Sequence, residues 1–288
     1  HEIVLSVAQD KFFAAQLKSN FGDLGEAVKG LLDDYQRKAK MNENISSLED
    51  MQAFMERFPA FKTHAFNVSK HVALMGELAR LTAVYKLLDI SALEQEISCS
   101  SDQSGHLGRL MAYIKNGSIQ MPDKIRLSTL YALRYEKDAI VRDIKTALSQ
   151  QGASDKQLGT IDCMLAYAGE KHRAGGLFAG GGFMSKLAKS VSTGLSGVEN
   201  VYTQHTPRLS MVLESILSGK GKLKDASVFP AVAASTSSPT EFVIFMVGGA
   251  TFEEATAVAE FNEKNPKFKV VLGGSCIHNS TSFTRDCM

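Results

Sequence analysis

Apolar residues recur at helical spacing through residues 12–168, in one segment after another. Spacing of three to four positions places apolar side chains on one face of an α-helix. Capping pairs such as Ser47 with Asp50 mark where individual helices begin. The longest predicted helix covers residues 61–88. The pattern therefore predicts a helical region that contains no convincing strand.

The first long helical pattern covers residues 12–37 and contains Gly22, Gly25 and Gly30. Each glycine lowers helix propensity by up to about 1 kcal/mol relative to alanine. We therefore expect a helix with a loosened middle.

A second helix is predicted to follow a polar, aperiodic connection at residues 37–45. Its apolar positions lie between residues 48 and 58, and Pro59 comes next. Proline has no backbone N–H and its ring clashes with the preceding turn, so we expect the helix to stop or kink there.

A different pattern covers residues 241–276. Residues 242–247 form an uninterrupted apolar run, which is typical of a parallel strand covered on both faces. Thr251 and Glu254 form a capping box that opens a helix. A second apolar run at residues 268–272 completes one right-handed βαβ unit.

Two parallel strands leave both sheet edges open and both faces uncovered. No second βαβ pattern precedes residue 241, and the chain begins at His1 rather than at a methionine. We therefore expect a fragment of a larger protein, mainly α with a C-terminal α/β piece.

Composition narrows the class of protein. The 288 residues are 44% hydrophobic and 22% charged, as in soluble globular proteins. A formal net charge of +1 argues against nucleic-acid binding, and no apolar run approaches the roughly 20 residues of a membrane span. The four cysteines are scattered without metal-ligand spacing, so we expect reduced thiols inside the cell and no metal site.

The turn at Gly248 and Gly249 offers one alternative, a phosphate- or nucleotide-binding α/β enzyme. The turn lacks the third glycine of GxGxxG and any GK[ST], and Glu253 and Glu254 would repel an anion. The sequence contains no catalytic signature and no cofactor motif, so we expect no enzyme. A general helical adaptor is a second alternative.

Several strings together resemble the C-terminal part of the SM (Sec/Munc) family of syntaxin-binding proteins, especially its vacuolar-protein-sorting branch. They are NFGDLGEAVKGLLDDYQ, FNVSKHVALMGELARL, RLSTLYALRYE, GVENVYTQHTPRL, and VIFMVGGATFEEA with VVLGGSCIHNSTSF. The resemblance covers nearly the whole chain.

The resemblance implies a helical domain inserted into a split central α/β domain, of which only the returning βαβ unit is present here. Residues 1–172 would be the helical domain with a long hairpin, residues 173–240 its lower part with loops, and residues 241–288 the returning segment. It also implies a cytoplasmic regulator of vesicle fusion at Golgi and endosomal membranes. Its partners would be syntaxin-type and other SNARE helices, its membrane association would be peripheral and through SNAREs only, and it would need no cofactor.

In the family the hairpin contacts SNARE helices, and here it corresponds to residues 21–81 with its tip at residues 37–47. We expect Pro59 to act as a hinge that gates a SNARE-binding groove. The candidate groove residues are Met55, Phe58, Val68, Val72 and Met75. The alternative for each of them is a position in the hairpin core.

Overall fold

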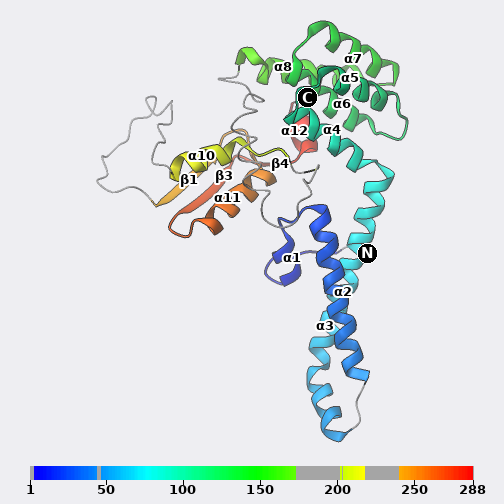
Figure 1. The fold of residues 1–288 in the computed structure, drawn as a ribbon, viewed down its shortest axis with the longest axis vertical. Helices are drawn as coiled ribbons and strands as arrows, with labels where there is room; N and C mark the ends of the chain where they lie inside the picture. Colours follow the sequence, from blue (N-terminus) through cyan, green and yellow to red (C-terminus); the bar gives the residue numbers. More distant parts are fainter. Residues whose placement is uncertain (1–2, 44–46, 173–201, 203, 218–239, 288) are drawn as a thin grey trace. The chain divides into compact units, whose positions relative to one another are not determined.

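A computed structural model describes residues 3–43, 47–172, 202, 204–217 and 240–287. The chain packs as two compact units, His1–Leu87 and Leu88–Met288. Figure 1 shows the helices and strands of both units. Most of the predicted 173–240 segment lies outside the described residues, so the predicted three-domain division stays a prediction.

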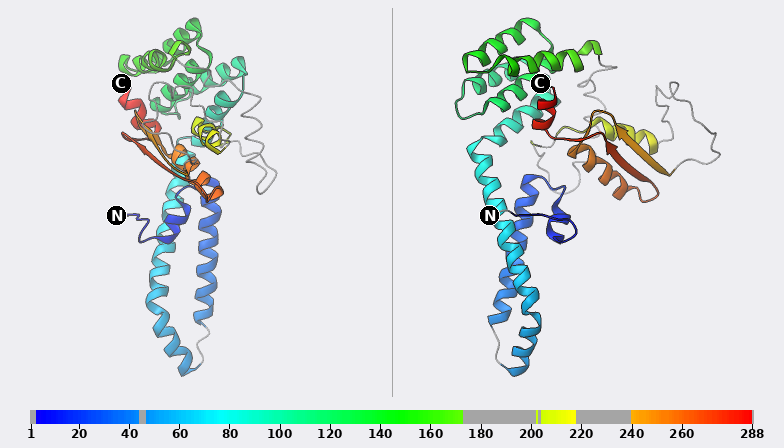
Figure 2. Two further views of the ribbon diagram at one scale, coloured as in Figure 1. Left: turned by 90° about the vertical axis from the view of Figure 1, so that its left-hand side faces the viewer. Right: turned by 180° about the vertical axis from the view of Figure 1, so that it is seen from behind.

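The first unit is built on a helical hairpin. A short helix α1 (Lys11–Gln16) precedes α2 (Phe21–Glu43) and the 37-residue α3 (Leu48–Val84). Helices α2 and α3 lie side by side along most of their length (Figure 2).

The prediction that the first long helix is loosened in its middle, at its glycines, is wrong about the position. The interruption lies at residues 17–20, whereas the three glycines lie within the continuous α2. Asn20 explains this, because its side-chain oxygen accepts a hydrogen bond from the Asp23 amide at 2.9 Å and so starts a new helix.

The connection between α2 and α3 is shorter than predicted, because α2 continues to Glu43. Lys38 and Asp34 form an ion pair of 2.6 Å one turn apart on α2, which helps the polar segment remain helical. The predicted capping box of Ser47 and Asp50 is confirmed at the start of α3.

Helix α3 does not stop at Pro59. An interior proline costs a helix about 3 kcal/mol, because it cannot donate to the carbonyl four residues earlier. Packing of α3 against α2 offsets this cost. Beyond Pro59, for example, Phe61 stacks on Tyr35 with ring centroids 5.5 Å apart.

The second unit begins with five helices, which are α4 (Leu87–Cys99), α5 (Gln103–Lys115), α6 (Met121–Tyr135), α7 (Asp138–Gln150) and α8 (Asp155–Ala168), followed by the 3-10 turn η1 (Glu170–His172). Helix α6 is central and packs against α5, α7 and α8. Apolar side chains from all five helices are fully buried in this core, including Leu93, Leu110, Leu127, Leu148 and Ile161.

The C-terminal part is an α/β module. It consists of α10 (Arg208–Leu217), β1 (Glu241–Met246), β2 (Ala250–Thr251), α11 (Phe252–Lys264), β3 (Lys269–Gly274), β4 (Ile277–His278) and α12 (Ser280–Asp286). Strands β1 and β3 pair in parallel from Glu241 with Lys269 to Met246 with Gly274, and β2 pairs in parallel with β4.

The β1–β3 pair is covered on one face. A core of Leu209, Leu213, Val258, Phe261 and Val270 joins α10, α11 and the strands. Alternate residues on the other face are exposed, namely Val243, Phe245 and Val271. Among the described residues no further strand joins this pair, and the predicted βαβ unit and mainly helical class are confirmed.

Gly249 lies between β1 and β2 and has a φ of +110°. This backbone conformation is strained for any residue that carries a side chain. An added Cβ would lie 2.5 Å from His278 Cδ2. We expect Gly249→Ala to lower the free energy of unfolding by about 1–3 kcal/mol. Urea denaturation and amide exchange of residues 241–278 would measure this loss.

Gly108 provides the matched control, because it lies within α5 and an added Cβ would meet no atom within 4 Å. Gly108→Ala should leave stability unchanged or raise it by up to about 1 kcal/mol. Equal effects of the two substitutions would contradict the crowding at Gly249.

Candidate functional site

Some side chains of α3 are buried inside the hairpin and therefore serve its folding. Val68 is 3% exposed, and Met75 is half-buried with its methyl group against Gly25 of α2. His64 faces Asp34 of α2 at 3.6 Å between Nε2 and Oδ2. Of the predicted groove residues, Met75 therefore points toward α2, and Val68 is buried within the hairpin unit.

The other three predicted groove residues lie on the outer surface of α3. Met55 is 68% exposed, Phe58 46% and Val72 38%. The structure thus divides the five candidates between two faces, and their role in binding stays a prediction.

The outer surface also includes Met51 and Phe66, both more than half exposed. Met51, Phe58 and Val72 are separated by multiples of seven residues, which is the repeat that brings one helix against another in coiled coils. We name Met51, Met55, Phe58, Phe66 and Val72 the outer row. Phe66 was missed from the sequence, although its position eleven residues after Met55 places it on the same face.

Pro59 lies next to Phe58 of the outer row and is exposed. The Thr63 hydroxyl donates a 3.0 Å hydrogen bond to the Pro59 carbonyl oxygen, and the helix is continuous through this turn. The missing N–H at Pro59 leaves one weak point in the backbone bonding of α3. The hinge remains a prediction that rests on this weak point.

A buried ion cluster fastens the N-terminal segment to α3. Asp10 is 3% exposed, pairs with Lys70, and lies 2.8 Å from His71 Nε2. Asp10 also caps α1 by accepting the Phe13 amide at 2.9 Å, and the Phe12 ring packs on His71. We name Asp10, Lys70 and His71 the clamp.

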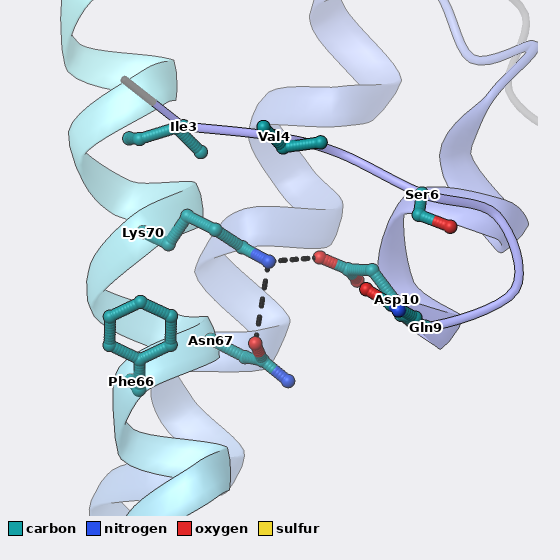
Figure 3. A pocket seen from close by; sticks show the side chains of 8 residues that line it. All are labelled: Ile3, Val4, Ser6, Gln9, Asp10, Phe66, Asn67 and Lys70. Atoms are coloured by element: carbon teal, nitrogen blue, oxygen red, sulfur yellow. Dashed lines mark hydrogen bonds and ion pairs between the residues drawn. The ribbon is translucent and has the colours of Figure 1, made fainter. Parts of the chain in front are cut away.

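A cavity of about 260 Å³ lies beside Asp10 and Lys70 of the clamp. Figure 3 shows the side chains that line it. The cavity is lined by Ile3, Val4, Ser6, Gln9, Asp10, Phe66, Asn67 and Lys70. Lys70 also donates to the Asn67 side chain at 3.3 Å. The charged groups of this cavity are already paired with each other, which favours a structural role over catalysis.

Burial by itself would raise the pKa of Asp10, but hydrogen bonds from Lys70, the Phe13 amide and His71 more than offset it and lower the pKa to about 2. A reduction from 3.8 to about 2 corresponds to about 2 kcal/mol of stabilisation of the folded state. The clamp is therefore a local source of stability for the hairpin.

Side chains of the protein fill the space beside the Gly248–Gly249 turn. His278 Cδ2 and Cys276 Sγ approach Gly249 closely, and Thr251 and Glu254 satisfy each other in the predicted capping box. These side chains lie where a phosphate would have to approach the glycine backbone, which argues against the nucleotide-binding alternative. Among the described residues, no cluster of three His, Cys, Asp or Glu side chains is suited to hold a metal ion.

None of the helices in the described part of the chain has both the length and the apolar composition that a membrane span requires.

Comparison with known proteins gives the family. The model of the Sec1 family matches residues 1–286. The chain belongs to the Sec1 family. The family resemblance carried by the sequence strings is thereby confirmed.

Sec1-family relatives align with nearly all of this chain. Vacuolar protein sorting-associated protein 45 of Dictyostelium discoideum is 40% identical over 287 residues, which are 99% of this chain and 50% of the relative. The human protein of the same name is 36% identical over 292 residues, 100% of this chain and 50% of the relative. The chain spans about half the length of the curated relatives it matches.

Solved structures agree with this assignment. One described as SM protein Vps45 in complex with the Qa SNARE Tlg2 has a TM-score of 0.81 and 37% identity, covering 99% of this chain and 50% of that one. The Unc18–syntaxin 1 complex from Monosiga brevicollis has a TM-score of 0.71 and 15% identity, covering 100% of this chain and 51% of that one, and shares the fold.

We predict that Asp10→Asn lowers the free energy of unfolding of the hairpin unit by about 2–4 kcal/mol, because it leaves Lys70 buried without a countercharge. Asparagine also caps helices well, so α1 keeps its first turn. Asp33→Asn is the matched control, since Asp33 is exposed on α2. Chemical denaturation should separate the two variants, and equal stability would contradict the clamp.

The same clamp predicts a pH dependence. The pKa of Asp10 is lower in the folded state than in the unfolded state, so its contribution is complete above about pH 4 and is lost as the pH falls toward 2. The stability difference between the parent chain and Asp10→Asn should therefore shrink over this interval in thermal melts. A difference that stays constant would show that the Asp10 charge does not stabilise the fold.

Proposed function

We propose that this chain binds syntaxin-type SNARE helices along the outer row of α3 and promotes correct assembly of SNARE complexes during Golgi and endosomal transport. The chain acts through binding, without a catalytic step. It works on the cytoplasmic side and reaches these membranes through its SNARE partners. Two observations support the proposal: the Sec1-family membership and the relative solved as a complex with a Qa SNARE.

The observation that carries the proposal is the exposed outer row itself. A solvated helix of a globular protein normally turns its apolar side chains inward, and contiguous exposed apolar patches mark interaction sites. Here α3 has an inner apolar face on α2 and a second apolar row outside. SNARE motifs are amphipathic helices, and an apolar row with polar flanks suits such a partner.

Polar residues of α3 lie beside the outer row and between its apolar side chains. Gln52 and Glu56 are exposed beside Met55, and Lys62 lies between Phe58 and Phe66. When a partner helix covers this exposed row, Met55 and Phe58 would supply most of the affinity, and charged residues such as Glu56 and Lys62 would set the register.

The proposal includes the domain organisation. Residues 1–172 form the helical domain with the hairpin, residues 173–240 its lower part, and residues 241–288 the returning segment of a split central α/β domain. The exposed face of β1 and β3 supports this, because parallel strands are covered on both faces in complete domains.

A double substitution, Met55→Ser with Phe58→Ser, tests the outer row. Both side chains are exposed, so the fold should remain intact, while affinity for a purified Qa SNARE of the Tlg2 type should fall at least about tenfold. Calorimetry would measure the dissociation constant.

Leu78→Ser is the matched control for the outer row, because Leu78 is also exposed on α3 but lies on another side of the helix. It should bind the SNARE as the parent chain does. Equal weakening by both changes would argue against the outer row as the binding site. Unchanged binding in the double variant would disprove that role.

Pro59→Ala tests the hinge. Alanine restores the missing N–H and favours the helix by about 3 kcal/mol, so opening at residues 55–63 should become rarer. We expect slower amide exchange there and a lower rate of SNARE-dependent liposome fusion. Leu78→Ser, an exposed change on α3 away from the outer row, should alter neither, and an unchanged fusion rate in Pro59→Ala would eliminate the hinge.

A further inference from the structure

Cys276 and His278 form a thiol–imidazole pair that has no part in the proposed SNARE binding. Cys276 follows β3, and His278 lies in β4. Cys276 Sγ is 3.1 Å from His278 Nε2. The cysteine is exposed, whereas His278 is only 7% exposed. A thiol open to solvent is thus backed by a fixed, buried imidazole.

The hydrogen bonds around His278 determine which ring nitrogen carries the proton. The Ser282 hydroxyl donates to the Asn279 carbonyl oxygen at 3.2 Å and accepts the Asn279 amide at 3.0 Å. Ser282 Oγ therefore meets His278 Nδ1, 3.1 Å away, as an acceptor, and Nδ1 carries the hydrogen. The lone pair is left on Nε2, the nitrogen that faces the thiol.

The ring is held in place from several sides. Gly249 passes directly against His278 and Cys276, and the Phe283 ring contacts His278 edge-on with centroids 5.5 Å apart. The Asp286 carboxylate lies 3.9 Å from Nε2. These contacts keep the base aimed at the sulfur.

We propose that Cys276 is a modification site for hydroperoxides, with His278 as the general base. A nucleophile within hydrogen-bond reach of an oriented base is the arrangement that activates a thiol. Gly249 closes one side of the sulfur, so a small reagent that approaches from solvent fits this site best.

The reaction balances without a further reactant. His278 Nε2 takes the thiol proton while sulfur attacks one peroxide oxygen, so that an S–O bond forms and the O–O bond breaks. The electron pair of the broken bond leaves with the second oxygen, which takes the proton from the imidazolium and departs as water or an alcohol. Sulfur is oxidised to a sulfenic acid, and the peroxide is reduced.

Cys163 provides an internal control, because it is an exposed thiol on α8 of the same chain. The full 288-residue chain is treated with hydrogen peroxide and dimedone, and the label on each cysteine peptide is followed by mass spectrometry. We expect Cys276 to be labelled at least about tenfold faster than Cys163, within the range of general-base catalysis. Equal rates would overturn the proposal without any variant.

Substitutions assign the effect to the pair. Cys276→Ser should remove the fast label, and His278→Gln should slow labelling of Cys276 to the rate of Cys163 while that of Cys163 stays constant. Circular dichroism and the melting temperature establish that His278→Gln is folded. A folded His278→Gln chain that is still labelled rapidly at Cys276 would overturn the role of the base.

Discussion

The pairing of α2 with α3 is the contact on which the rest of the first unit depends. A 37-residue helix that contains a proline would be weak alone, because helices in water gain most of their stability from a packed face. The stacking of Phe61 on Tyr35 and the contact of Met75 with Gly25 belong to that packed face. The clamp then secures the N-terminal segment to the same helix.

Helix α2 and the N-terminal segment cover only part of α3, and the exposed residues of the outer row lie on the rest of its surface. The apolar residues of this row are spaced for another helix. Under the proposed function, folding and SNARE binding would use different faces of one helix. This separation allows residues of the outer row to change without a large loss of hairpin stability.

The second unit also combines a part that is fully packed with a part that leaves one face exposed. Helices α4 to α8 bury a dense apolar core, whereas the α/β module buries one face of its strands and exposes the other. The tight turn at Gly249 brings β4 against β2 and sets His278 beside Cys276. A constraint of backbone geometry therefore places two reactive side chains together.

The sequence by itself determined the helical run, the βαβ unit, the capping boxes at Ser47 and Thr251, and the family, since these depend on local periodicity and on strings of adjacent residues. The tertiary structure alone decided that α3 continues through Pro59, that Val68 and Met75 face inward, and that Asp10 meets Lys70. Each of these depends on contacts between residues distant in the chain, whose packing energy outweighs local propensity. Periodicity shows that a helix has apolar positions, but only its neighbours decide which of them are buried.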